Sequence, residues 1–557
     1  MAQVASKPYP RLLLAPFLAT EHFPIPNKDI LSWTFDDYKH DWDEPIYIDA
    51  YHPDRTSISA RQAKTLIRQL VAGLRAWGLQ KGDCICIHSL NHVYYPIFFL
   101  AVAAAGGVLA GTNPAYTPHE LTHALKIAKV KYVVVAPDFL APMEKAMEAV
   151  GLGKSELVIF NPNGEAAPEG YKQWPELLTH GEQDWTRFDD LQTSKGTECA
   201  RLFSSGTTGL PKSASYSHYN LVAQHTLVYD SVPRPWRAVR LLALPMFHAA
   251  IIPAAFCTPL RSGERAYVMP RFDLEKWLWA HEKYQITDFM VVPPQAVAIV
   301  NSPLRDKYSL KSVRIGNSGA APLDPKLQAR LQQLLAPGVP FTQVWGMTET
   351  TCVCTRFPYP QKDITGSIGF PLPGIDLKIV DDAGKDISRY DVRGELCVRG
   401  PTIVAGYFDN PEANARDWDG DGYFHTGDVV YCDGKTKLWY IVDRKKELIK
   451  VRAFQVTPPE LEGHLLDHPD IVDAAVIGVP DPARDSELPR AYVVRRPGSM
   501  EKPTTVELHE YMRERLASYK QLMGGIVFLD AIPKNASGKI LKRVLREQAK
   551  REMAARL

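Results

Sequence analysis

Residues 202–212 read Leu-Phe-Ser-Ser-Gly-Thr-Thr-Gly-Leu-Pro-Lys. Glycine lets the backbone curl so that several N–H groups point inward, and hydroxyl groups and a lysine add donors and positive charge. The stretch therefore predicts a concave site for a polyphosphate. Its glycines are spaced too closely for the ordinary nucleotide-binding loop, in which Gly-Lys-Ser/Thr also follows directly. A flexible linker is the alternative, but apolar residues precede the stretch, and the ordered-looking sequence 215–218 follows it.

The stretch resembles the phosphate-binding signature of the adenylate-forming superfamily, Ser-Ser/Gly-Gly-Thr-Thr-Gly-x-Pro-Lys-Gly. That superfamily contains acyl- and aryl-CoA ligases, beetle luciferases and the adenylation domains of peptide synthetases. Only Ser213 departs from the pattern, because it replaces a small Gly or Ala. The resemblance implies that ATP or AMP is bound by Ser204, Ser205, Gly206, Thr207, Thr208, Gly209 and Lys212.

Length and composition set the class of protein. A chain of 557 residues is too long for one core and predicts about two to four domains. A net charge of +2 provides no broad positive field, so it argues against a nucleic-acid or acidic-membrane partner. The eight cysteines form no C-x-x-C pair, which favours reduced thiols in an intracellular protein.

One segment, residues 93–111, is almost wholly apolar and calls for a membrane check. Pro96 and the pair Gly106-Gly107 interrupt it, and no Arg/Lys cluster flanks it. We therefore expect no membrane span, but a buried helix that leads into a buried strand.

The order of the elements predicts the fold class. Ser59 and Gln62 form a capping box before apolar residues at helical spacing, and Gly78 ends that helix. Predicted strands then alternate with helices, which is typical of a doubly wound parallel sheet; the clearest strands span 84–90, 132–136, 241–244, 289–292 and 313–315. From about residue 376, short strands separated by turns predict a small β-barrel subdomain. After the charged run 444–447 a compact α+β segment follows.

We thus expect an α/β protein in two parts. Residues 1–443 form a large N-terminal domain of doubly wound α/β subdomains with the small β-barrel subdomain, which binds AMP and the acyl group. Residues 444–557 form a small, mobile α+β domain. The resemblance spans roughly residues 30 to 545 and includes at least six motifs in the superfamily's order.

Residues 343–350 read Gln-Val-Trp-Gly-Met-Thr-Glu-Thr and resemble the superfamily's Tyr-Gly-x-Thr-Glu motif, with Trp in place of Tyr. The resemblance implies that Trp345 and Gly346 contact the adenine, that Thr348 reaches the phosphate and that Glu349 holds Mg²⁺. Taken alone, the segment could be a strand end with an incidental glutamate. Residues 318–322 resemble the loop that passes the adenine, which implies contacts from Gly319, Ala320 and Ala321.

The later motifs imply the ribose site, the hinge and the catalytic lysine. Asp428, in Tyr-Phe-His-Thr-Gly-Asp, matches the residue that accepts from both ribose hydroxyls, and Arg444 matches the arginine that also reaches the ribose. Lys446 matches the hinge between the domains. Lys539 matches the lysine that bridges the acyl carboxylate and the α-phosphate, a role that suits a mobile point charge.

The acyl pocket is expected near residues 244–254. His248 matches the aromatic gate beside this pocket, and Ala249 stands where enzymes for α-amino acids carry an aspartate, so an amino-acid substrate is disfavoured. The expected lining is apolar and includes His248, Ala249, Ala250, Ile252, Gln343 and Met347. Arylpropenoic, arylacetic and medium-chain fatty acids all fit such a pocket.

Residues 447–456 place the chain nearest to the 4-coumarate–CoA ligase-like branch. Lys450, Arg452 and Gln455 match residues of the thioester-forming step. Ala453 stands where the branch has a glycine that lines the path of the pantetheine arm, so it adds one methyl group there.

We therefore expect an ATP-dependent carboxylic acid–CoA ligase that uses ATP, Mg²⁺ and coenzyme A. Two alternatives stay open: an adenylating enzyme that passes the acyl group to another acceptor such as a carrier protein, and a non-catalytic relative that binds acyl-adenylate. The last residues, Ala555-Arg556-Leu557, resemble the peroxisomal address typified by Ser-Lys-Leu. They imply a peroxisomal enzyme with an import receptor as partner, and otherwise a cytoplasmic one.

Overall fold

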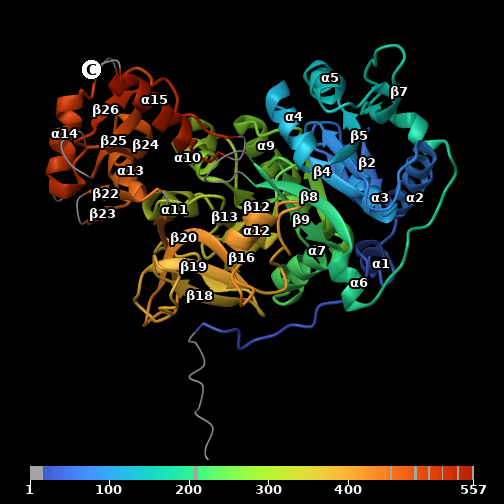
Figure 1. Ribbon diagram of the computed structural model, residues 1–557, viewed down its shortest axis with the longest axis horizontal. Coiled ribbons are helices and arrows are strands. Elements are labelled where there is room, and N and C mark those ends of the chain that lie inside the picture. The colour runs from blue at the N-terminus through green and yellow to red at the C-terminus, as the bar shows by residue number, and fades with distance from the viewer. Residues whose placement is uncertain are drawn as a thin grey trace, which may run out of the picture.

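A large domain and a small C-terminal domain make up the computed structural model of the chain (Figure 1). It describes residues 17–204, 211–445, 447–451, 454–481, 486–499, 502–516, 518–535 and 538–554, with the side chains of residues 444, 450, 454, 455 and 554 left out. The buried apolar clusters formed by residues 449–549 share no member with those formed by earlier residues. A division into two domains follows, whereas the boundary at residue 443 stays a prediction.

The first seven-stranded sheet has the order β7-β6-β5-β3-β4-β8-β9. All neighbours are parallel except β8 and β9. Strands are added on one side of β3 and then on the other, which is the doubly wound arrangement. The strands are β3 (Cys84–His88), β4 (Val108–Gly111), β5 (Val130–Val135), β6 (Leu157–Ile159), β7 (Lys172–Gln173), β8 (Glu198–Ser204) and β9 (Lys212–Ser217). The associated helices are α2 (Ala60–Trp77), α3 (Tyr94–Ala104), α4 (Pro118–Ile127), α5 (Leu140–Ala149), α6 (Leu191–Gly196) and α7 (His218–His225).

The second seven-stranded sheet has the order β14-β13-β12-β10-β11-β1-β2 and is wound about β10 in the same way. Its strands are β1 (Pro45–Asp49), β2 (Ser57–Ser59), β10 (Val239–Leu242), β11 (Arg265–Val268), β12 (Asp288–Val291), β13 (Ile315–Ser318) and β14 (Phe341–Gln343). The helices of this part are α1 (Ile30–Phe35), α8 (Thr258–Ser262), α9 (Leu274–Tyr284), α10 (Pro293–Asn301) and α11 (Pro325–Gln332). Ligands bind outside the carboxyl ends of such strands, where the order reverses.

A β-rich part follows the second sheet. It contains a three-stranded sheet of β15 (Trp345–Met347), β16 (Cys352–Arg356) and β17 (Phe370–Pro371), and a four-stranded sheet of β18 (Asp376–Val380), β19 (Gly394–Arg399), β20 (Phe424–Cys432) and β21 (Trp439–Arg444). A bridge between Gly369 and Trp439 joins the two sheets. Among the strands described here, no pairing closes the expected barrel between β15 and β18. The short helix α12 (Pro411–Asp417) lies between β19 and β20 in the chain.

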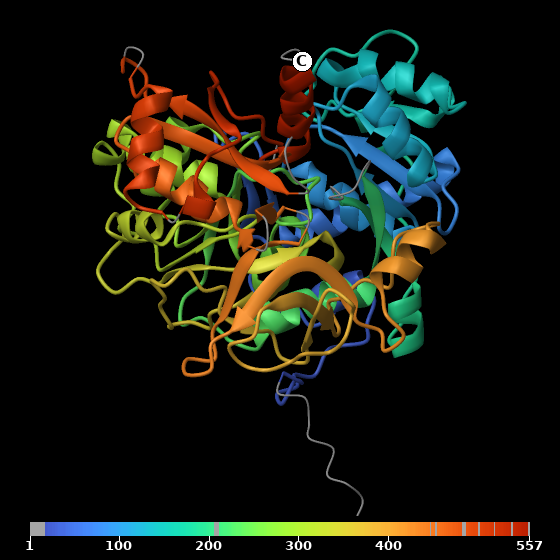
Figure 2. The same cartoon turned by 60° about the vertical axis from the view of Figure 1, so that its left-hand side comes forward.

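The small domain packs helices on a three-stranded sheet of β24 (Ile471–Pro480), β25 (Glu487–Arg495) and β26 (Gly525–Phe528). A hairpin of β22 (Ile449–Val451) and β23 (Phe454–Val456) precedes that sheet, and the helices are α13 (Pro458–Leu466), α14 (Thr505–Arg513) and α15 (Lys542–Ala554). Figure 2 shows α15 at the top, on the side of the small domain that faces the large one. An ion pair from Lys326 Nζ to Asp467 Oδ2, 2.5 Å long, joins the two domains.

Local sequence signals account for the best-defined elements. Helix α2 begins with the expected capping box, in which Ser59 accepts from the backbone of Gln62, and Gly78 ends it in the left-handed region at φ 110°. The apolar segment 93–111 is the buried helix α3 followed by the buried strand β4, as predicted. Within the described ranges, no helix has both the length and the apolar character to cross a membrane. Several predicted strands are present with shifted ends; β10, for example, begins at Val239 and not at residue 241.

Three buried histidines make the stability of the fold depend on pH. Burial lowers the pKa of His88 to about 4, that of His218 to about 4 and that of His281 to about 3. Since the folded pKa values lie below the value of the unfolded chain, the unfolded state binds more protons below about pH 6.5. Their contribution to stability is therefore complete above that pH and is lost as the pH falls toward 4.

We expect these three histidines and His248, whose pKa burial also lowers to about 4, to reduce the free energy of unfolding by roughly 5 kcal/mol between pH 7 and pH 5.5, about 1.3 kcal/mol for each histidine. His425 acts in the opposite direction, because its hydrogen bond to Glu395 raises its pKa. Thermal melting followed at both pH values measures the net effect. An equal melting midpoint at pH 7 and pH 5.5 would contradict the expectation.

Candidate active site

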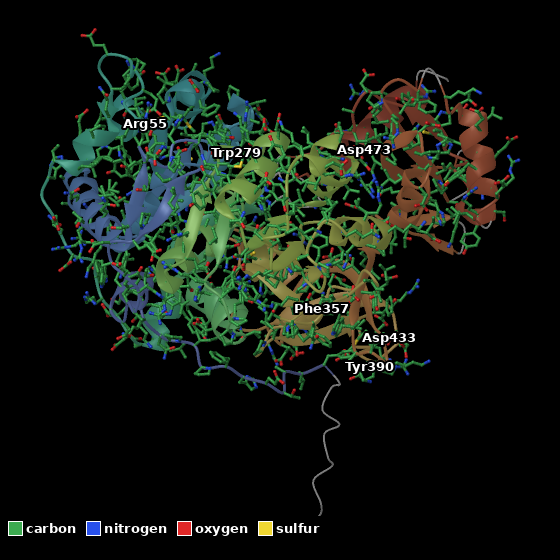
Figure 3. The ribbon with its side chains drawn as sticks, turned by 180° about the vertical axis from the view of Figure 1, so that it is seen from behind. Arg55, Trp279, Phe357, Tyr390, Asp433 and Asp473 are labelled. Atoms are coloured by element: carbon green, nitrogen blue, oxygen red, sulfur yellow. The ribbon has the colours of Figure 1, made fainter. Side chains whose placement is uncertain are left out.

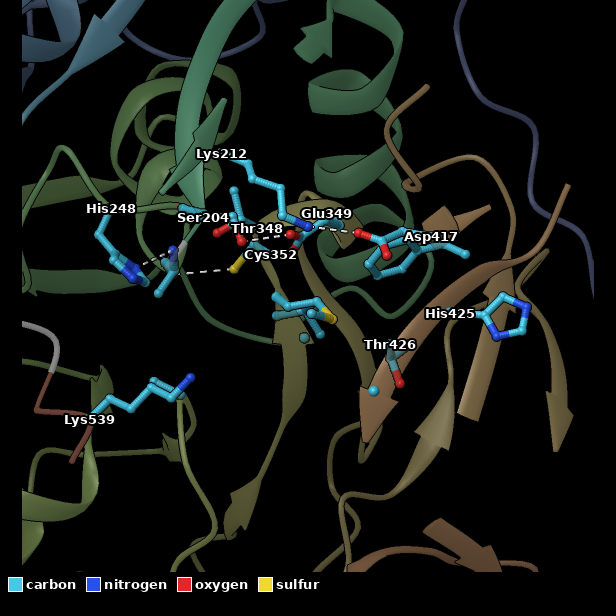
Figure 4. Close-up of a pocket in the computed structure, with 18 of the residues that line it drawn as sticks. Ser204, Lys212, His248, Thr348, Glu349, Cys352, Asp417, His425, Thr426 and Lys539 are labelled. Atoms are coloured by element: carbon cyan, nitrogen blue, oxygen red, sulfur yellow. Dashed lines mark hydrogen bonds and ion pairs between the residues drawn. The ribbon is translucent and has the colours of Figure 1, made fainter. Parts of the chain in front are cut away.

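A cavity of about 410 Å³ lies where the two large sheets, the β-rich part and the small domain meet (Figure 4). It opens beside the carboxyl ends of strands β8, β12 and β13, as expected for doubly wound sheets. Many of the residues predicted from the motifs line it, namely Ser204, Lys212, His248, Ala249, Ala250, Ala320, Gly346, Met347, Thr348, Glu349 and Lys539. The structure therefore brings together motifs that are far apart in the sequence.

A second cavity, of about 440 Å³, adjoins the first and lies between the large and small domains. The two cavities share Ala320, Val344, Gly346 and Lys539 as lining residues. The second one is also lined by residues predicted to hold the nucleotide, namely Ala321, Trp345 and Asp428, together with Gln343. The predicted acyl, phosphate and nucleoside positions thus lie in two adjoining cavities that share a wall.

The ends of the predicted phosphate loop are held by a β-ladder. Ser204 is the last residue of β8 and Lys212 the first of β9, and the two are register partners in this antiparallel pair. The loop therefore spans a hairpin whose ends lie beside the cavity. Ser205, Gly206, Thr207, Thr208 and Gly209 lie outside the described residues, so their predicted contacts stay predictions.

Glu349 is a buried carboxylate in which one oxygen accepts hydrogen bonds and the other has no partner among the described residues. Ser204 Oγ donates to Glu349 Oε1 at 2.6 Å, and the Tyr407 hydroxyl donates to the same oxygen at 2.7 Å. Glu349 is only 2% exposed, and its Oε2 atom has no hydrogen-bond partner among the described residues. A buried anionic oxygen of this kind fits Mg²⁺, which takes one or two carboxylates and completes its shell with water and substrate phosphates. No cluster of three or more acidic, His or Cys ligands exists within the described part of the chain, so such an ion would need those phosphates.

Lys212 lies beside the ring of Tyr407, the same tyrosine that donates to Glu349. Its Nζ atom lies 2.7 Å from Asp417 Oδ2 and 4.2 Å from the centre of the Tyr407 ring. Burial opposes ionisation of Asp417, but hydrogen bonds from Arg416 and Lys212 keep the pKa of this aspartate below its usual value. The lysine charge is thereby kept at the wall of the cavity, where it faces the position expected for phosphate.

Lys539 enters the cavity from the small domain. The segment before it folds back, since the Lys539 N–H donates to Asn535 Oδ1 at 2.8 Å and the Asn535 N–H donates to the Lys539 carbonyl at 2.9 Å. Gly538 has φ 79°, and a Cβ atom at this position would lie 2.9 Å from Pro294 Cγ of the large domain. Only glycine therefore lets this turn approach α10 and bring Lys539 to the site.

His248 faces Lys539 across the cavity (Figure 4). Burial, and then the positive charge of Lys539, lower the pKa of His248 to about 4. Nδ1 of His248 accepts from the Ala250 N–H at 3.2 Å, so the neutral ring carries its proton on Nε2. The imidazole is thus neutral at physiological pH. It lines the pocket and does not act as an acid.

The Trp345 indole holds the predicted ribose-binding carboxylate. Its Nε1–H donates to Asp428 Oδ2 at 2.8 Å, and both residues are buried. Asp428 is also the register partner of Arg444, so the two residues of the predicted ribose site lie side by side on β20 and β21. The indole N–H of Trp345, which a tyrosine lacks, thus fixes the position of Asp428.

Three predicted residues have different positions from those expected. Gln343 lines the second cavity rather than the first, and its amide forms hydrogen bonds with Leu323 and Gln328. Ile252 is 1% exposed in the core and lines neither cavity. Gly319 also lies outside both linings; a Cβ there would lie 3.0 Å from Met290 Cε and from Val344 Cγ2.

The structure describes only some of the residues predicted for the hinge and for the thioester-forming step. Lys446, Arg452 and Ala453 lie outside the described residues, as does the terminal segment 555–557. For Lys450 and Gln455 only the backbone is described, which places them as register partners in the β22–β23 hairpin.

Two family models of known proteins match the chain. Residues 37–408 match the family model described as AMP-binding enzyme, and residues 460–539 match the model described as AMP-binding enzyme C-terminal domain. The chain belongs to the AMP-binding enzyme family.

Similar proteins place this family member among the acyl-CoA ligases. Phenylacetyl-CoA ligase epaB of Aspergillus niger is 51% identical over 94% of this chain and 97% of that protein. 4-Coumarate–CoA ligase 2 of Oryza sativa subsp. japonica is 35% identical over 87% of this chain and 86% of that protein. The crystal structure of ATP-bound MatB from Rhodopseudomonas palustris has a TM-score of 0.82 at 27% identity, covering 94% and 99% of the two chains. The chain is an acyl-CoA ligase, an enzyme that uses a carboxylic acid, ATP and CoA.

The ligase site also contains residues that the motifs did not indicate. Tyr407, Arg416 and Asp417 orient Glu349 and Lys212, as described above. Cys352 lines the acyl side and donates to the Ala250 carbonyl at 3.2 Å. These residues are brought to the cavity by tertiary pairing, such as the bridge between Tyr407 and Ala214, and no local spacing signals it.

Proposed function

We propose that this ligase activates an aryl or medium-chain carboxylic acid whose apolar body lies in the 410 Å³ cavity. Apolar side chains line that side of the space, namely Ala249, Ala250, Met290, Val344, Met347 and Val353. No carboxylate replaces Ala249 to meet an ammonium group. The relative named phenylacetyl-CoA ligase, at 51% identity, supports an arylacetic acid as the first candidate.

The proposed first half-reaction joins the acid to AMP. A carboxylate oxygen of the acid forms a bond to the α-phosphorus of ATP, and the bond from this phosphorus to the bridging oxygen breaks, so pyrophosphate leaves. Two anions must approach one another, and Lys539, Lys212 and the hydroxyl of Thr348 supply positive charge and donors where they meet. Bound at the free oxygen of Glu349, Mg²⁺ would neutralise phosphate charge.

In the proposed second half-reaction the sulfur of CoA forms a bond to the acyl carbon, the bond from this carbon to the phosphate oxygen breaks, and AMP leaves while the thiol proton passes to solvent. In the arrangement described here, the small domain presents Lys539 to the cavity, which suits adenylation. We propose that the domain then turns about Lys446 and presents the hairpin of Lys450 and Gln455 to the thiol, and that Arg452 and Ala453 also take part in this step. Alternation of this kind lets one site serve two reactions.

The assembly of Glu349, Lys212, His248 and Lys539 around one apolar cavity is the observation that supports this proposal. Pyrophosphate and AMP release, measured over aromatic and aliphatic acids with and without CoA, tests it. We expect AMP to appear with CoA and one acid class to exceed the others by at least tenfold. Pyrophosphate release that CoA does not change would indicate another acyl acceptor. No release with any acid of either class would refute the proposed substrates.

A further inference from the structure

A third cavity, of about 80 Å³, continues the acyl side of the site into the large domain. Met290, Val344 and Val353 line both this deep cavity and the 410 Å³ cavity, so the two are separated only by side chains. A cavity of about 150 Å³ can hold benzene, so the smaller deep cavity has room for the tip of a substrate and not for its ring.

The far end of the deep cavity is polar, and two of its arginines are paired. Arg234 forms an ion pair with Asp288. Arg240 meets Glu264 with two hydrogen bonds, from Nε to Oε2 at 2.5 Å and from Nη2 to Oε1 at 3.3 Å. These two guanidinium groups are thus balanced by carboxylates of the protein.

Arg356 is the third arginine of the deep cavity and differs from the other two. It is the last residue of β16, is 9% exposed, and lines the cavity together with its neighbour Phe357, which Figure 3 labels within the large domain. One of its nitrogens, Nη1, donates to the Val228 carbonyl. No carboxylate of the described residues lies within ion-pair distance of it.

The polar end therefore holds an excess of one positive charge, with the three arginines against Asp288 and Glu264. A buried charge without a partner is unfavourable, and a guanidinium group offers up to five N–H donors in a fixed plane. Arg356 uses one of them on a backbone carbonyl. The remaining donors match an oxygen acceptor, and no other hydrogen bond from the Arg356 side chain is made to the described residues.

We infer that Arg356 is a specificity-determining residue that binds an oxygen acceptor at the end of the acid remote from its reacting carboxyl group. The inference rests on the proposed function, because it takes the apolar cavity as the site of the acyl chain. The acceptor is a hydroxyl, keto or carboxylate oxygen. The site thus selects acids with an apolar body and an oxygen at each end.

Paired acids that differ only at the remote end test this inference. Phenylacetic acid is compared with 4-hydroxyphenylacetic and 4-carboxyphenylacetic acids, and hexanoic acid with adipic acid, which separates neutral from anionic acceptors. We expect the wild-type kcat/KM to be at least tenfold higher for an acid with the acceptor than for its partner without it. Equal values within every pair overturn the inference even if no variant folds.

The variant Arg356→Met removes the donors and the charge and keeps an unbranched apolar side chain, which is shorter than that of arginine. We expect it to raise KM for the preferred acid at least tenfold and to leave kcat/KM for the unsubstituted partner within threefold. Arg265→Met, at an exposed position of the second sheet, is the matched control. If the ratio of kcat/KM within each pair of acids is the same in Arg356→Met as in the wild type, the arginine does not bind the substrate and has only a structural role. Absence of wild-type activity on every acid of these pairs would instead refute the proposed function.

Discussion

Replacing Lys539 with alanine is expected to lower the rate of adenylation at least 100-fold and to change the affinity for ATP less than threefold. Lys539 reaches the cavity from the small domain, opposite His248, where the carboxylate and the α-phosphate would meet. One oriented charge or donor at such a position contributes about 3 to 4 kcal/mol to the transition state. ATP retains its other contacts, so binding persists. Pyrophosphate release in a single turnover measures the rate, and calorimetry measures ATP binding.

The matched control is Lys550→Ala, which removes an exposed lysine of the same domain and should leave both half-reactions unchanged. A second assay starts from chemically prepared acyl-adenylate and CoA. Thioester formation should survive in Lys539→Ala, because under the proposed function that step uses the β22–β23 hairpin and not Lys539. Wild-type adenylation in Lys539→Ala would show that the charge of this lysine is not used.

Glu349→Gln is expected to slow adenylation about 100-fold and to raise the Mg²⁺ concentration needed for half-maximal rate at least tenfold. The amide oxygen can still accept from Ser204 and Tyr407, so the fold around the site is kept. What disappears is the negative charge on the buried oxygen that has no partner among the described residues. Titration of the rate with MgCl₂ in both proteins measures the difference.

Tyr407→Phe is the companion variant, because it removes one hydrogen bond and leaves the carboxylate. We expect a loss of less than tenfold, with the Mg²⁺ requirement unchanged. The pKa of Tyr407, which burial and the neighbouring Glu349 raise, should fall in Glu349→Gln and report that the charge is gone. An identical Mg²⁺ dependence of the rate in wild type and Glu349→Gln would show that Glu349 does not bind the metal ion.

Signals carried by adjacent residues were enough to predict the elements that frame the site. The capping box at Ser59 and the left-handed Gly78 fixed α2, and short motifs of adjacent residues indicated Lys212, Glu349 and Lys539. Local patterns succeed here because caps, turns and strand periodicity depend on neighbours in the chain.

The pairs that position those residues could not be predicted in this way. Trp345 and Asp428 are 83 residues apart, and Lys212 and Asp417 are 205 apart. Their contacts depend on how whole sheets pack against one another, and no spacing in the chain encodes that. The excess positive charge at Arg356 could not be predicted from the sequence either. It depends on the ion pairs of Arg234 with Asp288 and of Arg240 with Glu264, which form only in the folded protein.

Gly538 lies at a point where the small domain approaches the large domain closely. Its turn fits only because no side chain stands between it and Pro294, although the two residues belong to different domains. A larger residue at position 538 would meet Pro294 and would also have to adopt φ 79°, so more space at position 294 would remove only one of the two obstacles. The approach of the small domain to the large one at this point thus depends on both residues, Gly538 in one domain and Pro294 in the other.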